Sequence, residues 1–238
     1  MVRAVLFDLD GTLLDIDIDA FLHDYFGALG PVVADVLGEP ADGASGLRAV
    51  LDATSAMMAP HAKATNREVF NTHFRDATGV DLNLDEFALP FERFYADVFP
   101  TLRKGLGPCD GAREAVLTAL DLGMRVAIAT NPIFPADAIY ERMRWADVAD
   151  LPVDLVTTYE VMHATKPLSA YFSETAAMLG VDACDCLMVG DDRVLDMGAA
   201  DVGMRTFYVG PPPLPTGDFH GNLRDLTDLL ERLASEPG

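Results

Sequence analysis

Five short apolar runs alternate with helical patterns along most of the chain. The residues between the later runs have helical spacing over 111–123, 135–146, 167–180 and 194–203, and a last helix is expected at about 222–234. Strands that alternate with helices of this kind indicate a parallel sheet covered on both faces. We therefore predict an α/β fold with a doubly wound parallel sheet, whose strands fall at 4–7, 125–130, 154–158, 186–190 and 205–210.

The interval from Asp15 to Pro108 interrupts this alternation, because it contains no clear strand. Its apolar residues recur at helical spacing instead, which predicts a helical domain of residues 15–108 inserted after the first strand. The α/β core then consists of residues 1–14 and 109–238. We interpret the aromatic and aliphatic stripe of the insert as its own core rather than a ligand site: Phe87, Phe91, Phe94, Tyr95 and Val98.

The charge balance excludes some classes of partner. Seventeen Lys and Arg against 38 Asp and Glu give a net charge of −21, which repels nucleic-acid backbones and anionic membrane surfaces. No segment approaches the roughly 20 apolar residues of a membrane span, and the first apolar run is too short for a signal peptide. We expect no nucleic acid or membrane partner. The sequence does not indicate the oligomeric state.

Three cysteines, Cys109, Cys184 and Cys186, are too few and too unevenly placed for a disulfide framework. We interpret Cys184 and Cys186 as small buried hydrophobic residues, because no Cys or His pair nearby completes a zinc site. A reducing compartment, and hence a cytoplasmic location, is the prediction.

Polar residues follow three of the predicted strands. Asp8 and Asp10 follow the first, Thr130 and Asn131 follow the second, and Asp191 and Asp192 follow the fourth. Ligands of parallel α/β sheets bind beyond the carboxyl ends of the strands, and alternation in an extended segment turns Asp8 and Asp10 to the same side. Carboxylates that converge in this way repel one another unless a cation offsets them, and Mg²⁺ is the hard, oxygen-binding cation that suits them.

Four short motifs occur in order along the core: "DLDGT" (8–12), "ATN" (129–131), "TKP" (165–167) and "GDDRVLD" (190–196). Together they resemble the motifs of the haloacid dehalogenase-like hydrolases, in the branch with a helical cap inserted after the first motif. The resemblance implies Asp8 as nucleophile, Asp10 as acid/base, Thr130 on the phosphate and Lys166 as neutralising cation. It also implies a metal site of Asp8, Asp10 and Asp191, supported by Asp192 and Asp196.

The residue chemistry agrees with these roles. A carboxylate such as Asp8 can attack phosphorus and form an aspartyl-phosphate, and a second acid such as Asp10 can serve both halves of the reaction. We expect Gly11 to let backbone N–H groups approach the phosphate, which Thr130, Asn131 and Lys166 also contact. Lys166 precedes Pro167, which favours a position beside the first turn of a helix. Asp192 and Asp196 would face one another on a helix and repel.

We predict a Mg²⁺-dependent phosphatase that acts on a small phosphorylated metabolite. A phosphosugar mutase or a dehalogenase of the same family is an alternative, and a non-catalytic binding or regulatory module is one of a different class. The insert carries no recognised motif; we expect it to act as a lid, hinged near 15–19 and 105–111, with Arg67 the first candidate to face Asp8.

Overall fold

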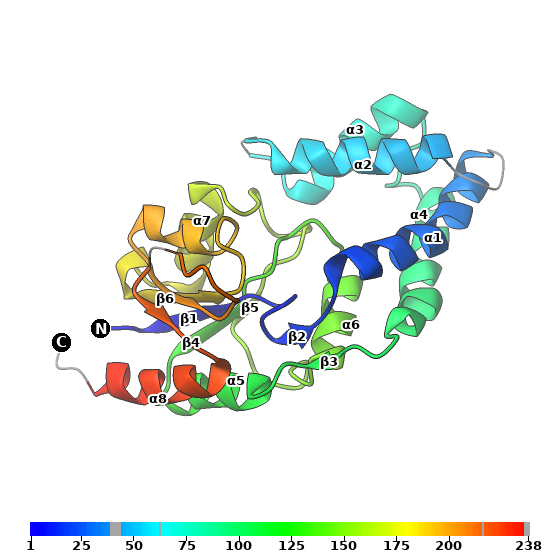
Figure 1. Ribbon diagram of the computed structural model, residues 1–238. Coiled ribbons are helices and arrows are strands. Elements are labelled where there is room, and N and C mark those ends of the chain that lie inside the picture. Colours follow the sequence, from blue (N-terminus) through cyan, green and yellow to red (C-terminus); the bar gives the residue numbers. More distant parts are fainter. Residues whose placement is uncertain (39–43, 62, 216, 236–238) are drawn as a thin grey trace.

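The computed structural model describes residues 1–38, 44–61, 63–215 and 217–235 (Figure 1). Its main sheet has six strands in the order β5-β4-β1-β6-β7-β8, and all neighbouring strands run parallel. The predicted α/β fold is confirmed, and the last strand is one that the sequence pattern did not predict. The strands are β1 (Ala4–Phe7), β4 (Arg125–Ile128), β5 (Leu155–Val156), β6 (Cys186–Gly190), β7 (Arg205–Tyr208) and β8 (Phe219–His220).

Helices cover both faces of this sheet (Figure 1). Alternate residues of β1 supply the two faces, because side chains of a strand point to opposite sides: Val5 and Phe7 belong to one hydrophobic cluster, and Ala4 and Leu6 to another. The first cluster includes apolar residues of α5 (Ala112–Asp121) and α8 (Leu223–Ala234), and the second includes those of α7 (Ser169–Leu179) and the 3₁₀ segment Met197–Val202.

Two of the predicted helices differ from the structure. The pattern at 194–203 forms only the 3₁₀ segment Met197–Val202, because residues 192–196 form a hydrogen-bonded turn. Helix α7 begins at Ser169, so Pro167 lies before the helix rather than in its first turn. Lys166 is therefore not at the helix start as predicted. Its ammonium is paired with the carboxylates of Asp8 and Asp196 instead.

The insert lies between two short strands, β2 (Leu14–Asp15) and β3 (Gly107–Pro108). They pair antiparallel, Leu14 with Pro108 and Asp15 with Gly107, so the two connections to the core lie side by side. A ladder of two residues is too short to leave a sequence pattern, which is why no strand was predicted there. Between them are α1 (Ile18–Leu37), α2 (Ala44–Met58), α3 (Asn66–Thr78), α4 (Asp85–Arg93), a π-helical turn (Phe94–Val98) and a 3₁₀ segment (Phe99–Leu102).

Aromatic side chains join the insert to the core. Trp145, at the end of α6 (Ala136–Trp145), stacks on Phe99 with ring centroids 5.5 Å apart, and Phe21 of α1 meets the indole edge-on at 6.1 Å. Phe94 of the predicted stripe is buried as expected, but Val98 is 37% exposed. The π-helical turn changes the residue spacing there, so the 3.6-residue pattern no longer places Val98 on the buried face.

Two further features concern the burial of the cysteines and the length and apolar character of the helices. Cys186 is buried in β6 as predicted, whereas Cys184 is exposed because it lies in the 3₁₀ turn Ala183–Asp185 that precedes the strand. Within the described ranges, no helix combines the length and apolar character needed to cross a lipid bilayer.

Candidate active site

The carboxyl ends of the three neighbouring strands β4, β1 and β6 meet at one edge of the sheet. Asp8 and Asp10 follow β1, Thr130 and Asn131 follow β4, and Asp191 follows β6. All five residues line one cavity of about 280 Å³. The remaining residues predicted from the sequence border the same cavity: Gly11, Lys166, Asp192 and Asp196.

The ammonium of Lys166 joins two carboxylates in this cavity. Its Nζ donates to Asp8 Oδ1 at 2.7 Å and to Asp196 Oδ1 at 2.5 Å, and the side chains of Lys166 and Asp196 are only 1% and 2% exposed. Burial acts to lower the pKa of Lys166, but the carboxylates of Asp196 and Asp8 outweigh it and the pKa is raised. Burial raises the pKa of Asp8, and the lysine opposes that rise. Lys166 is thus a fixed positive charge beside Asp8.

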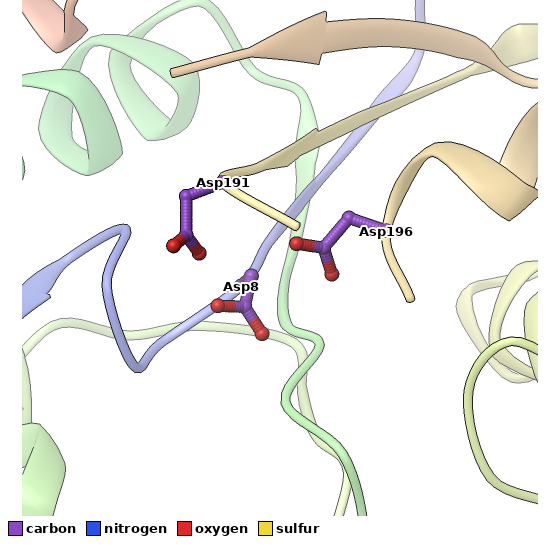
Figure 2. A group of neighbouring side chains, drawn as sticks. All are labelled: Asp8, Asp191 and Asp196. Atoms are coloured by element: carbon purple, nitrogen blue, oxygen red, sulfur yellow. The ribbon is translucent and has the colours of Figure 1, made fainter. Parts of the chain in front are cut away.

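Asp8, Asp191 and Asp196 form an acidic group whose side chains point toward one another (Figure 2). Each offers an oxygen within 4.8 Å of the others. Burial, and then the neighbouring charge of Asp196, raise the pKa of Asp191 to about 6. Crowded carboxylate oxygens are the donor set that suits a hard divalent cation such as Mg²⁺. The residues present therefore fit the predicted metal.

The three carboxylates of this acidic group differ in the hydrogen bonds that they accept. Asp196 uses both oxygens, Oδ1 with Lys166 and Oδ2 with the backbone N–H of Asp192 at 3.0 Å. Asp191 Oδ1 accepts from the hydroxyl of Thr12 at 3.2 Å. In the part of the chain that the structure describes, no donor contacts Oδ2 of Asp8 or of Asp191. Asp8 and Asp191 are therefore better placed to bind a cation, and Asp196 to hold Lys166.

Two glycines make room for these carboxylates. Gly11 has a φ of +83°, and a Cβ at this position would overlap the carboxylate of Asp191. A Cβ on Gly190 would overlap Asp196 in the same way. The N–H of Gly11 itself donates to Leu14 O at 2.8 Å and is engaged within the turn. That Gly11 lets other backbone N–H groups approach a phosphate stays a prediction. Glycine serves here for the left-handed turn and for the close approach of Asp191.

Asp10 has a partner that the sequence reading missed. Its Oδ2 accepts from Nη1 of Arg142 on α6, whose side chain is 1% exposed and whose guanidinium lies 4.6 Å from the ring centre of Phe134. Asp10 thus lies outside the acidic group of Figure 2, and its contact does not favour the predicted role as a third metal ligand. The available signal was helical spacing, since Arg142 shares a face with the buried Ala138 and Trp145.

The loops around Thr130 and Asn131 fix the end of β4. The carbonyl of Thr130 accepts from the hydroxyls of Thr157 at 2.8 Å and Tyr171 at 2.9 Å. Asn131 Oδ1 accepts from the backbone N–H of Lys166 at 3.2 Å. The loop after β4 and the loop that carries Lys166 are therefore tied together beside the cavity.

Asp192 is exposed and belongs to a turn. Its Oδ1 accepts from the backbone N–H groups of Val194 at 2.7 Å and Leu195 at 2.8 Å, while its own N–H donates to Asp196. Because residues 192–196 are not helical, the predicted repulsion between two facing carboxylates does not arise. Asp192 supports the site by shaping the turn that presents Asp196.

A second cavity, of about 250 Å³, lies between the insert and the core segments that follow β4 and β5. Ile133 borders both cavities. Arg67, predicted to face Asp8, is exposed and lines this second cavity instead. Helix α3 therefore does not direct Arg67 at the acidic group.

Comparison with known proteins gives the family context. A model of the haloacid dehalogenase-like hydrolases matches residues 2–202. Ribulose-1,5-bisphosphate 5-phosphatase of Halopiger xanaduensis is 32% identical over 127 residues, which cover 52% of this chain and 48% of that protein. Phosphoglycolate phosphatase of Pseudomonas syringae pv. tomato is 28% identical over 205 residues, 80% of this chain and 63% of that protein. The chain thus spans less than two thirds of the length of either curated relative.

Solved structures share the fold over nearly the whole chain. A HAD phosphatase from Thermococcus onnurineus has a TM-score of 0.60 and 22% identity, covering 96% of this chain and 98% of that one. An L-2-haloacid dehalogenase from Xanthobacter autotrophicus has a TM-score of 0.54 and 17% identity, covering 97% and 99%. At such identities the likeness is one of fold alone. The family match over residues 2–202, on a chain with this fold and these four motifs, shows that the protein belongs to the haloacid dehalogenase-like hydrolases.

Proposed function

We propose that this protein is a Mg²⁺-dependent phosphatase that hydrolyses a small phosphate monoester through an aspartyl-phosphate on Asp8. The observation that carries the proposal is the position of Asp8, bound to Lys166 at 2.7 Å and grouped with Asp191 at a cavity that Asp10 also borders. The two curated relatives are named for small phosphorylated compounds, which supports the same substrate class here.

In the first step, a carboxylate oxygen of Asp8 attacks phosphorus, and the bond between phosphorus and the leaving oxygen breaks. Lys166 offsets the negative charge of the incoming phosphate, and Thr130 and Asn131 border the space that it would occupy. Asp8 and Asp191 would hold Mg²⁺, which when bound supplies the positive charge that the crowded carboxylates and the phosphate need. The product of this step is an alcohol and the acyl-phosphate of Asp8.

Asp10 is the residue that we assign to the proton transfers. It gives a proton to the leaving oxygen, and it later takes one from the water that attacks the acyl-phosphate. Arg142 engages Oδ2 of Asp10, while Oδ1 has no hydrogen-bond partner among the described residues. The arginine thus orients the carboxylate, and the buried Oδ1, which has no described partner to hold a proton, is the oxygen to which we assign the proton exchange.

A dehalogenase would make less use of this arrangement. A halide leaves without taking up a proton, and a haloacid carries no phosphate whose charge must be offset. A binding module would need none of these chemical groups in one cavity. A phosphosugar mutase would use the same residues, so only the products distinguish it from a phosphatase.

We also propose that the chain is divided into a core of residues 1–14 and 109–238 and a helical cap of residues 15–108. The paired strands β2 and β3 at the base of the insert support that division. We propose a cytoplasmic location and a small phosphate ester, rather than nucleic acid or a membrane, as the partner.

The test is a panel of phosphate esters and sugar phosphates assayed with Mg²⁺, with 2-chloropropionate as the haloacid and Asp8→Asn as the matched variant. We expect the wild type to release inorganic phosphate from at least one ester, and the Asp8→Asn variant and the EDTA-treated enzyme to release none. Transfer of phosphate within a sugar without its release would indicate a mutase. Release of chloride without hydrolysis of any ester would overturn the proposal.

A further inference from the structure

Two loops carry the groups that would bind phosphate. The first follows β4 and includes Asn131 and Pro132; the second precedes α7 and includes Ala164 and Lys166. Within the core, the backbone N–H of Lys166 donates to Asn131 Oδ1 at 3.2 Å. The spacing of the two loops decides how far Lys166 lies from the residues at the end of β4.

A residue of the insert also bridges these two loops. Asn66, the first residue of α3, is fully buried, and its Nδ2 donates to Pro132 O at 3.0 Å and to Ala164 O at 3.2 Å. The accepting carbonyls lie one residue after Asn131 and two residues before Lys166. A side-chain amide has two N–H donors in one plane, so a single asparagine can serve both carbonyls.

The start of α3 is built to hold Asn66 in this position. Thr65 and Glu68 form a capping box, in which the hydroxyl of Thr65 accepts from the N–H of Glu68 and the carboxylate of Glu68 accepts from the N–H of Thr65. The first N–H groups of a helix have no partner within it. Here those of Asn66 and Arg67 donate to core carbonyls, Met162 O and Tyr159 O, both at 2.8 Å.

We propose that Asn66 is a positioning residue, through which the insert sets the spacing of the two phosphate-binding loops. This inference rests on the proposed function, because it concerns the same site. Asn66 touches neither Asp8 nor the cavity, so it acts through Asn131 and Lys166. The insert then affects turnover even of an ester too small to touch it, which a cap that only selects the leaving group would not do.

The chain offers a matched control on the same helix. Asn71 is also buried, and its Nδ2 donates to Asn83 Oδ1 at 3.1 Å, wholly within the insert. It borders the second cavity and is absent from the lining of the first. Replacement of Asn71 by alanine therefore removes a buried amide of the insert without changing any contact to the two loops.

The experiment measures kcat and KM for p-nitrophenyl phosphate, and the inhibition constant of inorganic phosphate, in wild type, Asn66→Ala and Asn71→Ala. Each is assayed with Mg²⁺ well below its melting temperature. We expect Asn66→Ala to weaken phosphate inhibition and lower kcat/KM by about tenfold, the size of one or two lost hydrogen bonds. Asn71→Ala should keep kcat/KM and the inhibition constant of phosphate within about twofold of wild type. This holds even if its melting temperature falls as much as that of Asn66→Ala.

A second substitution separates positioning from folding. Asn66→Ser is smaller and keeps one donor, so its inhibition constant should lie between those of wild type and Asn66→Ala, and it replaces the alanine variant should that fail to fold. If the Asn66 variants lose thermal stability but keep the phosphate inhibition and kcat/KM of Asn71→Ala, Asn66 only anchors the insert and the inference is wrong. Failure of the proposed function would appear separately, as a wild type that hydrolyses no ester.

Discussion

Replacement of Lys166 by methionine tests whether this buried lysine holds the site together. Methionine has a similar length but no charge. The change leaves Asp8 and Asp196, with side chains 10% and 2% exposed, without the ammonium that bonds to them at 2.7 and 2.5 Å. Removal of one partner of a buried ion pair costs about 3–5 kcal/mol, because the other charge stays buried and unpaired. We expect Lys166→Met to lose about that much free energy of unfolding at neutral pH.

The loss should shrink as the pH falls. Burial already raises the pKa of Asp8, and removal of the lysine takes away the interaction that opposes the rise. The folded variant then binds more protons than its unfolded chain, whose aspartates have a pKa of about 3.9, so its unfolding free energy increases as pH decreases from neutral to about 5. A second change, Asp196→Asn, removes one of the two uncompensated charges and should recover part of the loss.

Urea denaturation followed by circular dichroism measures these free energies in the wild type, Lys166→Met and Lys166→Met/Asp196→Asn at both pH values. Phosphate release from p-nitrophenyl phosphate should be absent in both variants. An unchanged urea midpoint for Lys166→Met at neutral pH would refute the reasoning, since a lysine paired as described cannot be removed without cost.

Other changes test single parts of the site. Asp8→Asn should keep the fold, seen by circular dichroism, and abolish phosphate release, because an amide cannot form the acyl-phosphate. Gly11→Ala should lower the unfolding free energy by at least about 1 kcal/mol in urea denaturation, because φ is +83° and a Cβ would overlap Asp191. Mg²⁺ should raise the melting temperature more at neutral pH than at about pH 5, since the pKa of Asp191 is about 6 and only its ionised form binds a cation; equal shifts would contradict this. Arg142→Gln should lower kcat for p-nitrophenyl phosphate by about tenfold or more, because Asp10 loses its partner, whereas Arg144→Gln, on the exposed side of the same helix, should leave kcat unchanged.

The sheet and the positions of the site residues could be predicted because both depend on local patterns. The apolar runs at 4–7 and 186–190 are strands of those lengths, and a polar residue at the end of such a strand lies at the sheet edge by topology. Asp8 and Asp191 therefore reach one cavity as expected. Lys166 lies in a loop and follows no strand, so only the resemblance to the family motifs placed it at the same cavity. Their catalytic roles remain predictions until variants are assayed.

Contacts between distant residues left no comparable pattern. Arg142 and Asp10 are 132 positions apart, and an arginine in an amphipathic helix reads as a surface residue unless its buried neighbours are known. Asn66 reaches Pro132 and Ala164 only because α3 is capped at Thr65 and turned toward the core. The bond from the N–H of Gly11 to Leu14 O likewise depends on how the turn closes, which the glycine alone does not indicate.

The aromatic junction between insert and core has a practical consequence. Trp145 is the only tryptophan in the sequence, and its indole stacks on Phe99 while Nε1 donates to Glu141 Oε1 at 2.9 Å. Any movement that separates Phe99 from α6 would expose the indole to water, and its fluorescence emission would shift to longer wavelength. The protein therefore contains its own optical reporter, with which the response of the insert to phosphate or Mg²⁺ can be followed in solution without a label.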